Sequence, residues 1–161
     1  MPQLEYCRCL SLAAHPRIVG IKEAVGDLAR VRELLRLVPR GFAVLSGDDP
    51  TACEAVLAGA RGVISVTANV VPAAVTAVMA AALRGERELA LRLDGDLQPL
   101  HLALSLEPNP KPVKWALTEM KMINPGIRLP LTWLSAAAQP QLRNALRAAQ
   151  AESNALQACS A

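Results

Sequence analysis

Aromatic side chains are nearly absent from this 161-residue chain, which has one tyrosine, one phenylalanine and two tryptophans. The hydrophobic core must therefore consist mainly of Ala, Leu and Val, a composition that suits packed helices and buried parallel strands. Charged residues make up only 19% of the chain, but hydrophobic residues reach 52%, so we do not expect a disordered protein.

Other absences argue against whole classes of protein. No apolar run approaches the roughly 18 residues that a membrane span requires. The N-terminus has no charged stretch followed by an apolar one, so no secretory signal is predicted. The net charge is +3, and the basic residues form no dense block interleaved with aromatics, which argues against nucleic-acid binding. We therefore expect a soluble, cytoplasmic protein with no membrane or nucleic-acid partner.

The cysteines do not match a metal-binding motif. Cys7 and Cys9 are separated by one residue, whereas a zinc knuckle has roughly two to four, and no second pair follows. We interpret both as free thiols and expect neither a metal nor a cofactor. A metal-binding module built on these two cysteines is the weakest alternative, and stoichiometric zinc in the purified protein would be needed to support it.

Short β-rich runs alternate with helical patterns near the start of the chain. The predicted strands lie at residues 18–24, 42–45 and 63–67. Helices are predicted between them, at 28–38 and 50–58. This alternation with short loops predicts βαβ units and a parallel sheet.

Only helices are predicted after residue 69. They lie at residues 72–83, 86–100, 111–120 and 140–151. The sequence thus predicts an α/β fold in which three parallel strands with their helices are followed by a helical region. The predicted divisions are an atypical N-terminal segment over 1–14, the strand-containing part over 15–83 and the helical part over 84–161.

Lys22 is the strongest candidate for chemistry. It stands at the C-terminal end of the first predicted strand, among Ile and Val residues, and active sites of parallel α/β folds are built at that end. Apolar surroundings would disfavour the ammonium form and lower the lysine pKa, and a neutral amine can form a Schiff base with a ketone. Glu23 should point to the opposite face of the strand. A solvated lysine paired with some carboxylate is the simpler alternative.

Polar residues also follow the other two predicted strands. The segment Ser46–Asp49 is consistent with a helix cap or, less well, a cation site, and its Gly47 would let a substrate approach the backbone. Thr67 and Asn69 are better explained as helix caps than as ligand contacts. His101 stands among leucines on a predicted helix, with no carboxylate or nucleophile paired with it in the sequence, and we interpret it as a hydrogen-bonded structural histidine.

Five segments in order resemble the dihydrodipicolinate synthase family of pyruvate-dependent class I aldolases. They are Ile18–Ala24, Leu45–Asp49, Gly62–Val70, Glu107–Ala116 and Arg128–Leu131. The resemblance covers roughly residues 15 to 150. It implies the C-terminal part of a TIM (β/α)8 barrel followed by a helical extension. A complete barrel typically needs about 250 residues, so we expect the first half to be missing.

The resemblance also implies an activity and its residues. Family members condense pyruvate with aspartate semialdehyde in lysine biosynthesis, usually as homotetramers. Lys22 matches the Schiff-base lysine, Ile64 matches an isoleucine that borders bound pyruvate, and Gly47 matches the glycine that leaves space beside it. We therefore expect a truncated lyase whose partners are its two small-molecule substrates and either further copies of itself or a complementary chain.

The same resemblance leaves part of the machinery unaccounted for. The family carries its proton-relay tyrosine and threonines, its carboxylate-binding Thr-Thr step and its aldehyde-binding arginine in the preceding half, and Tyr6 matches no family motif. A start inside the gene or a frameshift upstream of Ala13 is our hypothesis for the atypical first residues. The alternative function is a catalytically inactive remnant that acts as a docking subunit.

Overall fold

A computed structural model describes the backbone of residues 2–158 and the side chains of residues 7–151. The chain divides into two compact units. The first comprises Met1–Ser65 with Met79–Arg87, and the second comprises Val66–Val78 with Glu88–Ala161.

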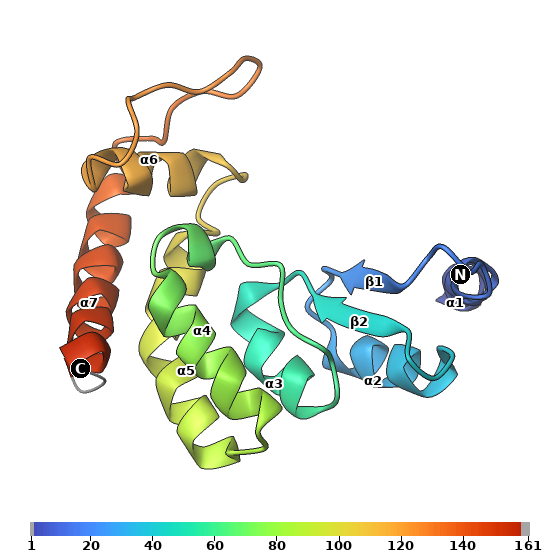
Figure 1. The fold of residues 1–161 in the computed structure, drawn as a ribbon. Helices are drawn as coiled ribbons and strands as arrows, with labels where there is room; N and C mark the ends of the chain where they lie inside the picture. The colour runs from blue at the N-terminus through green and yellow to red at the C-terminus, as the bar shows by residue number, and fades with distance from the viewer. Residues whose placement is uncertain (1, 159–161) are drawn as a thin grey trace. The chain divides into compact units, whose positions relative to one another are not determined.

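The first unit contains a two-stranded parallel sheet (Figure 1). Strand β1 (Gly20–Glu23) pairs with β2 (Ala43–Ser46), so that Lys22 lies opposite Leu45 and Glu23 opposite Ser46. Gly20 permits the close approach of the two strands, because a Cβ there would lie 2.6 Å from the carbonyl oxygen of Ala43. Successive side chains point to opposite faces of a strand. The sheet therefore has one face with Glu23, Val44 and Ser46 and another with Lys22 and Leu45.

Two helices cover the first of these faces. Helix α2 (Leu28–Leu37) begins after Asp27, whose carboxylate accepts hydrogen bonds from the backbone of Ala29 and Arg30 at 2.8 and 3.3 Å. Its buried residues are Val31 and Leu34, and α2 and α3 (Ala52–Leu57) both pack on β2. Glu23, Val44 and Ser46 are correspondingly buried.

The prediction of a third strand at 63–67 is wrong in extent. A single parallel bridge joins Ser46 and Val63, supported by hydrogen bonds from Ser46 N to Gly62 O and from Ile64 N to Ser46 O. Strand β2 ends at Ser46, and the chain then turns into a short 3₁₀ helix, η1 (Asp49–Thr51), so a longer ladder has no partner. Residues Thr67–Asn69 form a second 3₁₀ turn, η2.

Helix α1 (Pro2–Ala13) occupies most of the segment predicted to be atypical. Cys7 is exposed and Cys9 partly exposed, and both are free thiols. The side chain of Tyr6 lies outside the described residues.

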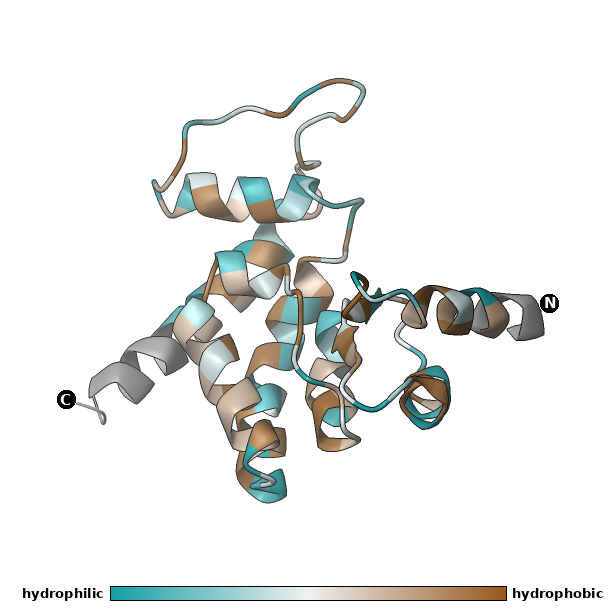
Figure 2. Ribbon diagram, turned by 45° about the vertical axis from the view of Figure 1, so that its right-hand side comes forward, coloured by the Kyte–Doolittle hydropathy of each residue, from teal (hydrophilic) through white to brown (hydrophobic). Residues whose placement is uncertain are grey.

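The predicted helices of the later part of the chain are confirmed. They are α4 (Pro72–Leu83), α5 (Arg87–Ala103), α6 (Lys111–Glu119) and α7 (Gln139–Ala158). Within the second unit, Leu97, Leu100, Leu142 and Leu146 are buried together with Ala90, Ala103, Val113 and Trp115, in agreement with the predicted core of Ala, Leu and Val. Hydrophobic and hydrophilic residues are interleaved along the helices (Figure 2). None of the helices in the described part of the chain is long and apolar enough to cross a membrane.

Candidate functional site

Lys22, Gly47 and Ile64 occupy neighbouring positions on one face of the sheet. The register places Lys22 beside Leu45. Two residues further along the chain, the Ser46–Val63 bridge places Gly47 beside Ile64 on the same face. Adjacent strands lie about 5 Å apart, so Lys22 and Ile64 are separated by roughly 10 Å across the sheet. All three residues belong to the first unit, and the structure therefore brings the predicted site residues together.

This face is open to solvent, contrary to our expectation that apolar side chains surround the lysine. Lys22 is exposed and Ile64 is 49% exposed. Helices α2 and α3 of the first unit pack on β2 and cover the other face. The strand position of Lys22 was predictable from the sequence, whereas its burial would depend on what lies against this face.

Gly47 provides space for the stem of Lys22. A Cβ at Gly47 would lie 2.3 Å from Cε and 3.0 Å from Cγ of Lys22, and 2.8 Å from Cβ of Ala24. Its backbone N–H also donates a hydrogen bond of 2.7 Å to the carbonyl of Glu23. The glycine therefore fixes how the lysine side chain leaves the strand, a role that adds to the predicted space for a substrate.

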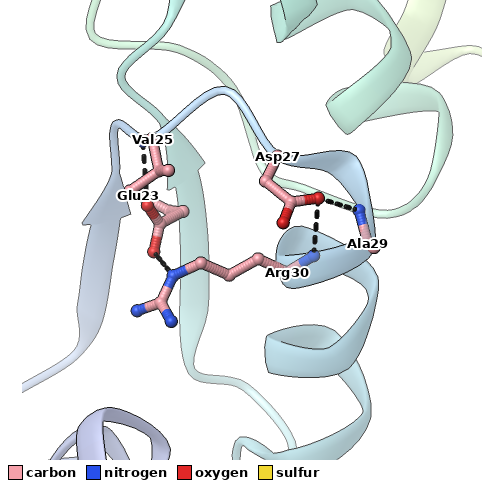
Figure 3. Close-up of polar contacts among 5 residues, drawn as sticks. All are labelled: Glu23, Val25, Asp27, Ala29 and Arg30. Carbon is pink, nitrogen blue, oxygen red and sulfur yellow. Dashed lines mark hydrogen bonds and ion pairs between the residues drawn. The ribbon is translucent and has the colours of Figure 1, made fainter. Parts of the chain in front are cut away.

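Glu23 lies on the opposite face of β1 from Lys22, as the alternation of side chains along a strand predicts, and it does not neutralise the lysine. It is 5% exposed, and its carboxylate accepts hydrogen bonds from Arg30 Nε at 2.5 Å and from Val25 N at 2.9 Å (Figure 3). Figure 3 also shows Asp27 capping the helix that carries Arg30. The negative charge of Glu23 is thus compensated on the helix-covered face. Among the described residues, Lys22 makes no ion pair.

The loop Ser46–Asp49 is stabilised by its own hydrogen bonds. The hydroxyl of Ser46 accepts a hydrogen bond from Asp48 N and donates one to Asp48 O, at 3.2 and 3.1 Å. Asp48 Oδ2 accepts a hydrogen bond of 2.7 Å from the hydroxyl of Thr51. No group of three or more His, Cys, Asp or Glu suited to a metal ion occurs within the described residues. The cation-site alternative therefore gains no support.

His101 forms a buried network in the second unit. Its Nδ1 lies 2.7 Å from the hydroxyl of Thr67, and its Nε2 lies 3.8 Å from Asp94 Oδ1. Thr67, Asp94 and His101 are all buried, and Gln98 donates a hydrogen bond of 2.7 Å to the carboxylate of Asp94. The interpretation of His101 as a hydrogen-bonded structural residue fits this geometry. Asp94 was missed, although residues seven apart share one face of a helix and that spacing could have identified it.

A second polar cluster fixes the beginning of α6. Glu107 accepts hydrogen bonds from the Lys111 ammonium and from Ser135 N, the latter at 3.0 Å. These bonds, that from Lys111 first, lower the pKa of Glu107 to about 2. The cluster joins the segment before α6 to the segment before α7 and explains why the Glu107–Ala116 motif contains both charges.

Residues 3–149 match the sequence profile of the Dihydrodipicolinate synthetase family. This match covers most of the chain and includes all three candidate site residues. The chain belongs to the dihydrodipicolinate synthetase family.

Curated relatives in this family share high identity with the chain over part of their own length. The 4-hydroxy-tetrahydrodipicolinate synthase of Stutzerimonas stutzeri is 57% identical over 136 residues, which represent 84% of this chain and 47% of that protein. The synthase of Pseudomonas aeruginosa is 54% identical over the same shares of the two chains. The chain thus spans about half the length of the curated relatives it matches.

Solved structures of the family show the same fold over a similar share. A dihydrodipicolinate synthase from Acinetobacter baumannii, chloride-inhibited and complexed with pyruvate, superposes with a TM-score of 0.87 at 47% identity. The alignment covers 90% of this chain and 50% of that one. The synthase from Aquifex aeolicus gives a TM-score of 0.85 at 36% identity. The chain is therefore a partial TIM-barrel fragment of this family's fold, mostly helical and with two parallel strands.

Proposed function

We propose that this chain is the C-terminal half of a 4-hydroxy-tetrahydrodipicolinate synthase and carries the Schiff-base lysine of that enzyme, Lys22. The observation that supports this assignment most directly is the position of Lys22. It leaves the end of a parallel strand on the face opposite the helices, beside Gly47 and near Ile64. Active sites of parallel α/β barrels form at this end of their strands.

The chemistry assigned to Lys22 is nucleophilic. Its neutral amine adds to the keto carbon of pyruvate, and loss of water leaves an imine between the lysine nitrogen and that carbon. Loss of a proton from the methyl group turns this imine into an enamine. The enamine carbon attacks the aldehyde carbon of the second substrate, aspartate semialdehyde, and the aldehyde oxygen takes up a proton. Ile64 contributes apolar surface beside the bound pyruvate, and Gly47 leaves the lysine stem free to reach it.

The described face lacks groups that this reaction needs. General acid–base assistance contributes about 10²- to 10⁴-fold in typical sites. No tyrosine, histidine or carboxylate of the first unit shares the open face with Lys22 in the register of the described strands. We therefore expect pyruvate to bond slowly to the chain by itself, and turnover to require the other half of the barrel.

The test combines covalent trapping with turnover. The chain is incubated with pyruvate and borohydride, alone and with a separately expressed fragment containing the part of the S. stutzeri synthase that this chain does not match. Reduced adduct is located by peptide mass spectrometry, and condensation with aspartate semialdehyde is followed in a coupled assay. Lys22→Arg keeps the charge but removes Schiff-base chemistry. Lys114→Arg, the same change at a lysine of helix α6, is the matched control.

Adduct confined to Lys22 and turnover that depends on both chains and on Lys22 are the expected results. Adduct spread equally over the lysines would contradict the assignment of Lys22. Trapping at Lys22 without turnover in any combination would favour the alternative function, an inactive remnant that acts as a docking subunit.

A further inference from the structure

The turn that follows β1 is fixed by hydrogen bonds rather than by burial. Ala24 and Val25 are both exposed, Val25 by 72%, so packing of their side chains does not hold the turn. The backbone N–H of Val25 instead donates a hydrogen bond of 2.9 Å to Oε1 of Glu23, and this bond closes a loop around Ala24. Glu23 therefore sets the course of the chain immediately after Lys22.

The other carboxylate oxygen of Glu23 joins this turn to helix α2. It accepts a hydrogen bond of 2.5 Å from Nε of Arg30 (Figure 3). The same helix begins at the Asp27 cap, two residues after Val25. Because Glu23 is only 5% exposed, water is poorly placed to replace a partner that either oxygen loses. Two donors from different parts of the chain thus require two acceptor oxygens on one buried side chain.

Ala24 connects the turn to the lysine. A Cβ at Gly47 would lie 2.8 Å from Cβ of Ala24 and 2.3 Å from Cε of Lys22, so both side chains lie against this glycine. The N–H of Gly47 in turn donates a hydrogen bond of 2.7 Å to the carbonyl of Glu23. Movement of Ala24 would therefore change the space that directs the lysine stem.

We propose that Glu23 is a positioning residue for Lys22, because its carboxylate accepts the N–H of Val25 and thereby holds Ala24 and Gly47 where they direct the lysine side chain. The inference rests on the proposed function and deepens it with a residue from the helix-covered face. Arg30 compensates the charge of Glu23, whereas the oxygen bound to Val25 does the positioning. The two roles can therefore be separated by substitution.

Two double variants separate the hydrogen bond from the ion pair. Glu23→Leu with Arg30→Leu, the leucine pair, replaces both charges by apolar side chains, a change that is often neutral for stability, and leaves Val25 N–H without its acceptor. Glu23→Gln with Arg30→Leu removes the same charges but keeps an amide oxygen for Val25. Replacement of Val25 by its α-hydroxy acid is a third variant, which removes the N–H and leaves the ion pair intact. Circular dichroism and urea unfolding check that each variant folds.

Borohydride trapping at saturating pyruvate is followed at Lys22 by peptide mass spectrometry. The leucine pair and the α-hydroxy acid variant should trap at least fivefold more slowly than wild type, and the glutamine variant should restore most of the rate. Nuclear Overhauser effects between the ε-protons of Lys22 and the α-protons of Gly47 should follow the same order. This second measurement requires no pyruvate and does not depend on the proposed function.

Equal trapping rates and equal Overhauser effects in the leucine and glutamine variants would overturn the proposal and leave Glu23 and Arg30 as a structural ion pair. If the leucine pair fails to fold, wild-type behaviour of the α-hydroxy acid variant would overturn it alone. Absence of adduct from Lys22 in the wild-type chain would overturn the proposed function, and the Overhauser effects would still decide whether Glu23 positions the lysine.

Discussion

Replacement of Gly47 by alanine tests whether the space beside Lys22 controls its chemistry. The new Cβ would approach Lys22 Cε to 2.3 Å, about 1.1 Å inside the 3.4 Å at which ordinary contact begins. The lysine terminus can swing away, but Ala24 Cβ at 2.8 Å is fixed to the strand and cannot. The backbone must therefore move, and overpacking of this kind costs about 1–3 kcal/mol.

Two measurements follow from this geometry. The free energy of unfolding in urea should fall by about 1–3 kcal/mol. The rate of borohydride trapping with pyruvate should also fall, because the new Cβ forces the Lys22 side chain into another conformation. Gly126→Ala is the matched control, since nothing lies within 4 Å of a Cβ at that glycine. Unchanged stability together with an unchanged trapping rate in Gly47→Ala would refute the reasoning.

The remaining predictions concern stability. Arg30→Ala should lower the free energy of unfolding by about 3 kcal/mol in urea titrations, because it leaves the buried Glu23 carboxylate without its cation; a loss under 1 kcal/mol would contradict this. Gly95→Ala lies within α5, where nothing is within 4 Å of the new Cβ, and should raise the free energy of unfolding by roughly 0.5–1 kcal/mol. Destabilisation by this substitution would contradict the prediction. The lowered pKa of Glu107 beside Lys111 contributes stability that is present above its ordinary value of 4.5 and lost as pH falls through about 2. Thermal unfolding of Glu107→Gln should therefore lose pH dependence in that window, and a curve parallel to wild type would exclude the contribution.

Much of this fold could be predicted because its signals are local. The Asp27 cap and the helical spacing of Val31 and Leu34 locate α2, and the capping geometry agrees with it. Residues Lys111–Glu119 form the helix expected after the proline-rich break. Alternation along β1 correctly assigned Lys22 and Glu23 to opposite faces.

The parts that failed depend on distant partners. Residues 63–67 have the composition of a strand, but a ladder needs a neighbour, and β2 ends at Ser46. The burial expected around Lys22 likewise requires a covering element, which residue patterns near Lys22 do not encode. The roles proposed for Lys22, Gly47 and Ile64 rest on the family resemblance, because composition and spacing alone favoured a solvated lysine.

The pairing of Glu23 with Arg30 limits which insertions and deletions β1 can accept. Of two adjacent residues in this strand, Glu23 is buried on the helix-covered face and Lys22 is exposed on the other face. A shift of β1 by one residue against β2 would exchange them, because side chains alternate with a period of two. The lysine would enter the layer beneath α2 beside the Arg30 guanidinium, and the carboxylate would emerge where the amine had been. An insertion or deletion between Gly20 and Lys22 should therefore remove the Glu23–Arg30 ion pair and the exposed position of the Lys22 amine together.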